Sequence, residues 1–102
     1  MTVSQTEVVI TGLGIVSPIG IGRDAFWRSL QQGTSGVGPI RSFDATGLPV
    51  SIAAEVSDFD PRKYVANRKS LKVMCRDAQL AVAASVLARR DAGLADGTAS
   101  LA

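Results

Sequence analysis

The sequence predicts an α/β fold, and three of its segments carry that prediction. Residues 8–11 are largely β-branched and match a strand that is covered on both faces. Residues 50–56 alternate with a period of two, which is typical of a strand with one more polar face. A long apolar helix then runs to about Asp91. With a shorter helix between the two strands, the order is strand, helix, strand, helix, as in a parallel α/β sheet.

The first strand runs into a glycine-rich turn that ends at Gly20. The side chains of residues 8–10 suit a pleated strand. Gly12 and Gly14 lack a Cβ, so the backbone can turn sharply there or come close to a neighbouring element. Residues 1–6 are mostly polar, and we expect them to be a loose lead-in.

The middle of the chain is expected to hold one short helix and two connections. The helix runs from about Arg23 to Gln32, because Asp24 favours its N-terminus and Gly33 is placed to end it. Residues 33–39 contain three glycines and a proline, which predicts a loop. Residues 40–48 contain a turn signal and are therefore also predicted to be a connection between elements.

Two helices are predicted in the second half of the chain. Asp60 and Pro61 are typical of a helix start, and that helix is brief. Asn67 or Ser70 can cap the next helix, which we expect to be the longest and to end at Gly93.

The longest helix has two apolar sides. One side holds Leu71, Met74, Cys75, Ala78, Val82 and Ser85, and the opposite side holds Val73, Leu80, Ala84 and Leu87. A helix that is apolar nearly all round is buried between layers. Two strands cannot cover both sides, so we expect residues 1–102 to be part of one domain. Its remainder would lie beyond residue 102 or in a partner chain.

The composition excludes several classes of function. The chain has no histidine, so a hydrolase triad or imidazole-based acid–base catalysis cannot be assembled within it. A single cysteine, Cys75, rules out an internal disulfide, and the lack of a second cysteine and of histidine argues against a metal site with soft ligands. No apolar run is long enough for a membrane span, and no signal-type segment is present, so we expect a soluble cytoplasmic chain without cofactor.

Two sequence features suggest chemistry, but a structural interpretation is stronger for both. The glycines at 12 and 14 follow a predicted strand, as in dinucleotide-binding proteins, but Ser17 replaces the third glycine of that motif. An anion- or nucleotide-binding module is therefore a minor alternative. Cys75 has basic neighbours that would lower its pKa, but it lies on an apolar stripe with no base in the chain.

A basic cluster is the most informative polar feature. Residues 62–76 hold six of the eleven basic residues, although the net charge is only +2. On one continuous helix, Arg68, Lys69, Lys72 and Arg76 would fall within an arc of about 100° and form one positive face. Such a face attracts an acidic partner. Nucleic acid is disfavoured, because no aromatic residues are interleaved to stack on bases.

The motifs in order resemble the N-terminal region of the β-ketoacyl-[acyl-carrier-protein] synthases. The resemblance covers nearly the whole chain and rests on Val-Val-Ile-Thr-Gly-Leu-Gly-Ile-Val-Ser-Pro-Ile-Gly at 8–20, Phe26-Trp27 with Leu30, Gly33-x-Ser35-Gly36-Val37, Arg68-Lys69-x-x-Lys72-x-Met74, and Asp91-Ala-Gly-Leu94.

This resemblance implies an incomplete thiolase-like fold with αβαβα layers, in a protein that is usually a homodimer. It implies condensation of an acyl thioester with malonyl-acyl carrier protein in fatty-acid or polyketide biosynthesis. In the family, the nucleophilic cysteine and two histidines come later than this segment, so no catalytic residue carries over. Cys75 stands where many relatives have an aspartate, which is a departure from the family pattern.

One functional feature of the family does carry over by position. Relatives bind the acidic acyl carrier protein through basic residues at the start of the long helix, and Arg68, Lys69 and Lys72 match those positions. The resemblance therefore predicts a carrier-protein docking surface there. The alternative to a condensing enzyme is a relative that is not itself catalytic, namely a partner subunit that pairs with an active one.

Overall fold

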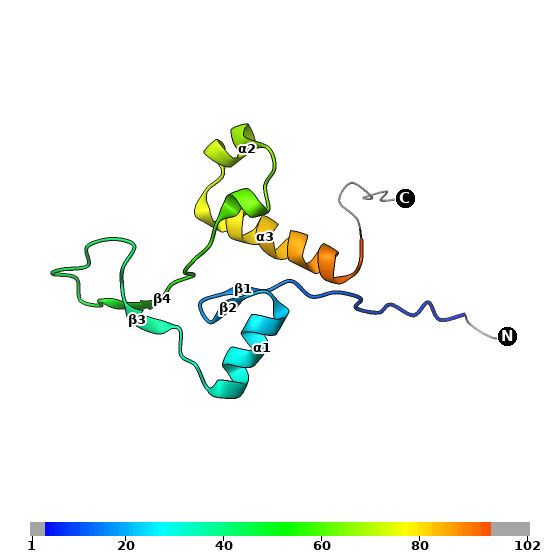
Figure 1. The fold of residues 1–102 in the computed structure, drawn as a ribbon, viewed down its shortest axis with the longest axis horizontal. Coiled ribbons are helices and arrows are strands. Elements are labelled where there is room, and N and C mark those ends of the chain that lie inside the picture. The colour runs from blue at the N-terminus through cyan, green and yellow to red at the C-terminus, as the bar shows by residue number, and fades with distance from the viewer. Residues whose placement is uncertain (1–3, 95–102) are drawn as a thin grey trace.

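The computed structural model describes residues 4–94 of the chain. Its elements, in chain order, are β1 (Val16–Ser17), β2 (Gly20–Ile21), α1 (Arg23–Gln32), β3 (Val37–Pro39), β4 (Ile52–Ala54), the 3₁₀ helix η1 (Pro61–Lys63), α2 (Arg68–Val73) and α3 (Arg76–Asp91). Helix α3 lies at the centre, with the β1–β2 hairpin and α1 on one side and α2 on the other (Figure 1). The described part thus mixes helices with very short strands.

The strand predicted at residues 8–11 is not formed. Residues 4–15 have no regular secondary structure, and the side chains of Val8 and Ile10 are 91% and 83% exposed. Figure 1 shows this segment running out from the body of the molecule. A strand needs a neighbour that accepts and donates backbone hydrogen bonds. No strand of the described residues lies beside this segment, so its apolar side chains and backbone are left uncovered.

Gly12 and Gly14 allow the close approach that the sequence predicted. A Cβ on Gly12 would collide with the backbone of Ala88, and one on Gly14 would collide with the backbone of Ala84. Leu13 lies between the two glycines, and its N–H donates to an Asp91 carboxylate oxygen at 2.9 Å. The N-terminal segment therefore lies directly on the C-terminal half of α3.

A small hairpin follows this contact. Strands β1 and β2 pair antiparallel, with Val16 opposite Ile21 and Ser17 opposite Gly20. The Ser17 hydroxyl donates to the Gly20 carbonyl at 2.8 Å and tightens the turn. The sequence predicted only that the segment ends here and did not predict a hairpin.

Helix α1 has the predicted bounds. Gly33 follows it in the left-handed conformation with φ of 67°, and its N–H donates to the Leu30 carbonyl. Only glycine adopts this conformation readily, which is why the helix ends there. The Ser29 hydroxyl donates to the Ile19 carbonyl at 2.6 Å and fastens α1 to the hairpin. Trp27 and Leu30, on the apolar side of α1, stay at least half exposed.

The second sheet corrects two expectations. Residues 37–39 form strand β3, although this stretch was predicted to be a loop, and the strand predicted at 50–56 is reduced to β4. The two strands pair antiparallel, so the sheets of the described residues are short hairpins and no parallel sheet is formed. The Glu55 carboxylate accepts the N–H groups of Arg41 and Ser42 at 2.7 and 3.1 Å, which holds the long connection between the strands.

The predicted long helix is broken in two. Asn67 caps α2 by accepting the N–H groups of Lys69 and Ser70, as expected. The chain then leaves the helical conformation at Met74 and Cys75, whose ψ angles are 127° and 166°. The two helices are separate elements, and one continuous helix from residue 67 to 91 was a wrong expectation.

Local interactions stabilise this break and the two ends of the region. The Gln79 side chain donates to the Met74 carbonyl at 3.1 Å, so a carbonyl freed by the break keeps a partner. Asp60 caps η1 through the Arg62 N–H, and Gly93 ends α3 with φ of 75°. Both of these ends were predicted from the sequence, because the chemistry of a cap lies within a few residues.

The described residues do not close around a core of their own. Ala83 is the single fully buried hydrophobic residue among them. The radius of gyration is 18.0 Å, whereas a compact domain of this length has about 13 Å. The accessible surface is 8207 Å², whereas about 5,500 Å² is typical for this mass. Helix α3 is not fully enclosed by the hairpin and η1, and its Val82 side chain is 37% exposed.

We predict that the isolated 102-residue chain does not melt cooperatively. Residues 4–94 bury one alanine fully, which is too little apolar burial to balance the loss of conformational entropy on folding. Small-angle scattering should give a radius of gyration well above about 13 Å. Calorimetry should show no sharp unfolding peak. A compact monomer with a two-state transition would contradict this expectation.

A second prediction concerns the N-terminus of α3. Cys75 occupies the cap position but makes no capping hydrogen bond through its side chain. In a peptide spanning residues 74–94, Cys75→Asp should stabilise the helix by about 1 kcal/mol, because the carboxylate can accept free N–H groups. Circular dichroism at 222 nm measures the gain in helicity. Cys75→Ala is the control without an acceptor, and equal helicity of the two variants would refute the prediction.

Candidate functional site

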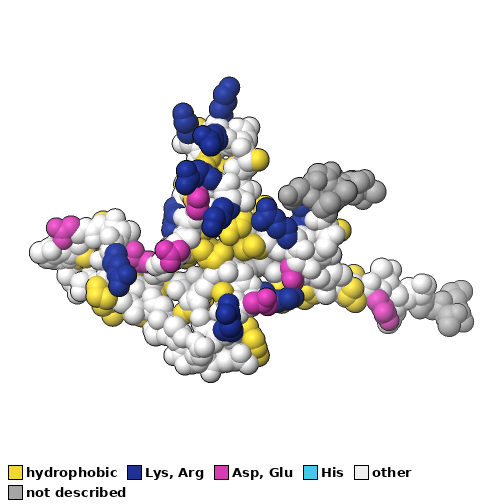
Figure 2. All heavy atoms as spheres, viewed as in Figure 1, with side chains coloured by type: hydrophobic (Ala, Val, Ile, Leu, Met, Phe, Trp, Pro, Cys, Tyr) yellow, Lys and Arg dark blue, Asp and Glu magenta, His cyan; other side chains and the backbone are white. Residues whose placement is uncertain are grey.

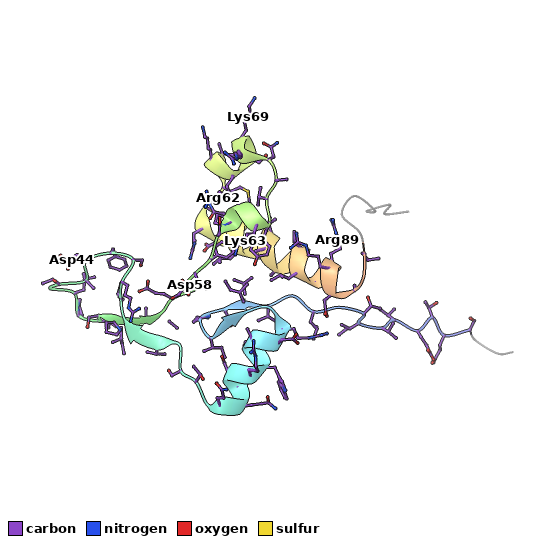
Figure 3. The ribbon with its side chains drawn as sticks, viewed as in Figure 1. Asp44, Asp58, Arg62, Lys63, Lys69 and Arg89 are labelled. Carbon is purple, nitrogen blue, oxygen red and sulfur yellow. The ribbon has the colours of Figure 1, made fainter. Side chains whose placement is uncertain are left out.

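Helix α2 projects from the rest of the molecule, and its exposed side chains are mostly basic. Figure 3 places Lys69 at the outer end of this helix, far from the hairpin and from α1. Figure 2 shows Lys and Arg side chains gathered over the same end of the molecule. The sequence-predicted site residues Arg68, Lys69 and Lys72 are all exposed there. We call these three residues the α2 basic face.

The charges of the α2 basic face are uncompensated. Arg68 and Lys72 are four residues apart and share one side of the helix, and Lys69 is adjacent. None of the three forms an ion pair with any residue in the described part of the chain. Like charges at this spacing repel by a few tenths of a kcal/mol, so an anionic partner would be attracted.

Arg76 does not belong to this face, which corrects the sequence-based expectation. The break at Met74 and Cys75 places Arg76 at the start of α3. Its guanidinium lies 5.0 Å from the centre of the Phe59 ring, and its Nη2 donates to the Val56 carbonyl at 3.1 Å. The Arg76 guanidinium therefore already interacts with Phe59 and Val56 of this chain.

The charge of Arg62 is also compensated. Its guanidinium bonds both carboxylate oxygens of Asp60, at 3.0 and 3.1 Å. These hydrogen bonds hold the pKa of Asp60 below its usual value and raise the pKa of Arg62. Lys63, which follows Arg62 in the chain, forms no ion pair with any of residues 4–94. Figure 3 shows that it lies below α2, nearer to α3.

Two aromatic residues that sequence reasoning did not single out flank η1, which contacts α2. The rings of Phe59 and Tyr64 stack with their centres 5.8 Å apart and their planes 8° apart. The Arg90 guanidinium lies 6.0 Å from the centre of the Tyr64 ring. The only sequence signal was an aromatic residue directly before the Asp60 cap, where an apolar side chain often packs against the helix that follows.

Cys75 lies at the start of α3 and is exposed, so its predicted place on a mid-helix apolar stripe is wrong. The chain contains no histidine that could act as its base. The described residues also contain no cluster of potential ligands that could hold a metal ion. Nothing in this arrangement activates the thiol for catalysis.

The glycine motif does not form a nucleotide site in the described structure. Gly12 and Gly14 lie against the backbone of α3, where even a Cβ would not fit. A phosphate site of this type needs the glycines to face a helix N-terminus. The geometry thus supports the structural interpretation of these glycines.

Among residues 4–94, no helix has both the length and the hydropathy that crossing a membrane requires.

A model of the family described as "Beta-ketoacyl synthase, N-terminal domain" matches residues 5–101. The chain is 46% identical over 90 residues to 3-oxoacyl-[acyl-carrier-protein] synthase 2 of Coxiella burnetii, which is 88% of this chain and 22% of that protein. It is 41% identical over 91 residues to the ketoacyl synthase beta subunit of the tetracenomycin polyketide synthase of Streptomyces glaucescens, covering 89% and 22%.

A solved structure, that of the ishigamide ketosynthase/chain length factor, is also similar. The TM-score is 0.77 at 41% sequence identity, over 85% of this chain and 21% of that one. The chain spans about a fifth of the length of the relatives that it matches. These matches confirm the resemblance inferred from the motifs, and the chain belongs to the β-ketoacyl synthase family, as part of its N-terminal domain.

Proposed function

We propose that this chain is the N-terminal part of a condensing enzyme of fatty-acid or polyketide biosynthesis. The observation that carries the proposal is the 46% identity, over most of this chain, to a 3-oxoacyl-[acyl-carrier-protein] synthase 2. The similar solved structure, at 41% identity, supports the same assignment. In the complete protein, these residues would form part of thiolase-like αβαβα layers, as the family resemblance implies.

The proposed reaction is a decarboxylative Claisen condensation. An acyl group passes from its thioester to a cysteine sulfur, and the carrier thiol leaves. Malonyl-acyl carrier protein then loses CO₂, and the carbanion that forms attacks the acyl carbonyl. The cysteine thiolate is expelled, and the product remains on the carrier with two more carbons. For this reaction the nucleophile and the two assisting histidines would have to come from outside the present 102 residues, since the chain has no histidine and its one cysteine is not activated.

Within that enzyme, we assign this chain the roles of scaffold and docking surface. The α2 basic face presents three uncompensated charges at an exposed end of the molecule. The acyl carrier protein of the family is acidic, so its encounter with this face would be electrostatically favoured. Such a surface acts mainly on the rate of encounter and on register, and it is screened by salt. The complete protein would act as a homodimer in the cytoplasm, as the resemblance implies.

A second candidate is a partner subunit that does not catalyse condensation. The 41% identity to a polyketide synthase beta subunit favours this alternative. Both candidates use the same scaffold in this region. They differ in whether the remainder of the protein supplies a nucleophilic cysteine and two histidines.

The complete protein that contains this chain should therefore catalyse condensation. Incubated with acyl and malonyl carrier proteins, it should release CO₂ and form an acyl chain two carbons longer, detected by mass spectrometry. Cys75→Ala should keep the rate within about twofold, because an exposed thiol at a helix start takes no part in the reaction. If the complete protein alone makes no product, the partner-subunit alternative is favoured. A large loss with Cys75→Ala would contradict the assignment of the nucleophile to another region.

Charge reversal tests the docking role. In the complete enzyme, Arg68→Glu, Lys69→Glu and Lys72→Glu together should lower kcat/KM for malonyl-acyl carrier protein by at least about tenfold at low salt. The effect should shrink as ionic strength rises, because exposed charges are screened. The dependence of the condensation rate on carrier-protein concentration gives this parameter. An unchanged dependence would remove the docking role.

A matched control separates docking from net charge. Lys69→Glu with Lys72→Glu changes the charge by the same amount as Arg28→Glu with Arg41→Glu, which alters exposed arginines on α1 and on the β3–β4 connection. These elements lie away from α2 (Figure 1). Only the first pair should raise KM for the carrier-bound substrate. Equal effects of both pairs would show that net charge alone is responsible.

A further inference from the structure

The position of α2 depends on contacts outside the helix itself. A helix of six residues is only marginally stable alone, and the break at Met74 and Cys75 separates it from α3. The α2 basic face is therefore fixed in space by the contact of α2 with η1 and by the two ends of the segment that carries it. One end follows η1, and the other enters α3 at Arg76.

Four side chains tie these two ends together. They form a row in which each member contacts the next by stacking or by a cation over a ring, in the order Arg76, Phe59, Tyr64 and Arg90. We call these residues the arginine–aromatic row. Phe59 and Tyr64 flank η1, whereas Arg76 and Arg90 lie near the two ends of α3. The row therefore packs η1 along α3, and the segment carrying α2 starts and ends on it.

Arg76 makes the additional contact that joins the two ends. Its guanidinium lies over the Phe59 ring and also donates from Nη2 to the Val56 carbonyl. A planar guanidinium can stack on a ring and donate sideways at the same time, whereas a lysine ammonium cannot reproduce that geometry. The segment before η1 is thereby fixed to the first residue of α3.

We propose that Arg76 is a positioning residue for carrier-protein docking and makes no contact with the carrier itself. It holds the base on which the α2 basic face stands, so that the three charges meet an acidic partner in one register. This proposal rests on the docking function proposed above. It differs from the expectation drawn from the sequence, in which Arg76 was a fourth charge of the same face.

The substitution Arg76→Lys distinguishes the two roles, because it keeps the charge and loses the planar group. It should be made in the complete enzyme, with kcat and KM measured for malonyl-acyl carrier protein at several salt concentrations. KM should rise about three- to tenfold, with kcat and the salt dependence of kcat/KM unchanged. KM for a small synthetic malonyl thioester without carrier protein should not change. Arg28→Lys, on α1, is the control and should leave every parameter unaltered.

Phe59→Leu provides a second variant that changes no charge. It should raise KM for the carrier-bound substrate in the same way, and combining it with Arg76→Lys should add little, since both disrupt one contact. A wild-type KM in Arg76→Lys would overturn the proposal, because a charge contact would then explain the residue. A lower kcat with unchanged KM in both variants would also overturn it, by showing a purely structural role.

Hydrogen exchange separates a failure of this inference from a failure of the docking function. Amides of α2 should exchange faster in Arg76→Lys than in the unaltered complete enzyme, whether or not the carrier protein binds there. If charge reversal of the α2 basic face leaves KM unchanged while α2 exchanges faster, docking is refuted and the anchoring of α2 stands. If exchange in α2 is unchanged, the positioning role is refuted.

Discussion

The contact between the glycine segment and α3 is the constraint on which the rest of the structure depends. Gly12 and Gly14 bring one backbone directly onto another at Ala84 and Ala88. Asp91 reinforces the contact by accepting the Leu13 N–H and pairing with Arg23 at 2.8 Å. These interactions join the start of the chain, the start of α1 and the end of α3. The hairpin and α1 take their places from this junction, because short hydrogen bonds attach each to the next.

Sequence signals within a few residues of each helix end were sufficient to predict where the helices begin or end. The caps at Asn67 and Asp60 and the left-handed glycines at 33 and 93 are local chemistry, and the structure has all of them. The strand predicted at 8–11 failed for a different reason. Pairing depends on a neighbouring strand, and residues 4–94 bring none to it. The sequence indicated that its apolar side chains suit burial, but residues 4–94 leave them exposed.

The candidate site shows the same division between local and distant causes. Residues 68, 69 and 72 share a face because they lie within six residues of one helix, so the sequence alone predicted it. The exclusion of Arg76 could not be predicted in this way. No glycine or proline marks the break at Met74 and Cys75, and Cys75 offers no capping bond. The partners of Arg76, Phe59 and Val56, lie 17 and 20 residues earlier in the chain.

The break at Met74 and Cys75 gives α2 and α3 different surroundings. Helix α3 packs against the backbone at Gly12 and Gly14, whereas α2 projects from the rest of the molecule (Figure 1). Repulsion between Arg68 and Lys72 costs about 0.2–0.5 kcal/mol, whereas the Asn67 cap contributes about 1 kcal/mol, so the cap outweighs the repulsion. The cap does not fix the direction of so short a helix. Its direction must come from the arginine–aromatic row beneath it, which is why an exposed basic face depends on residues that never touch its partner.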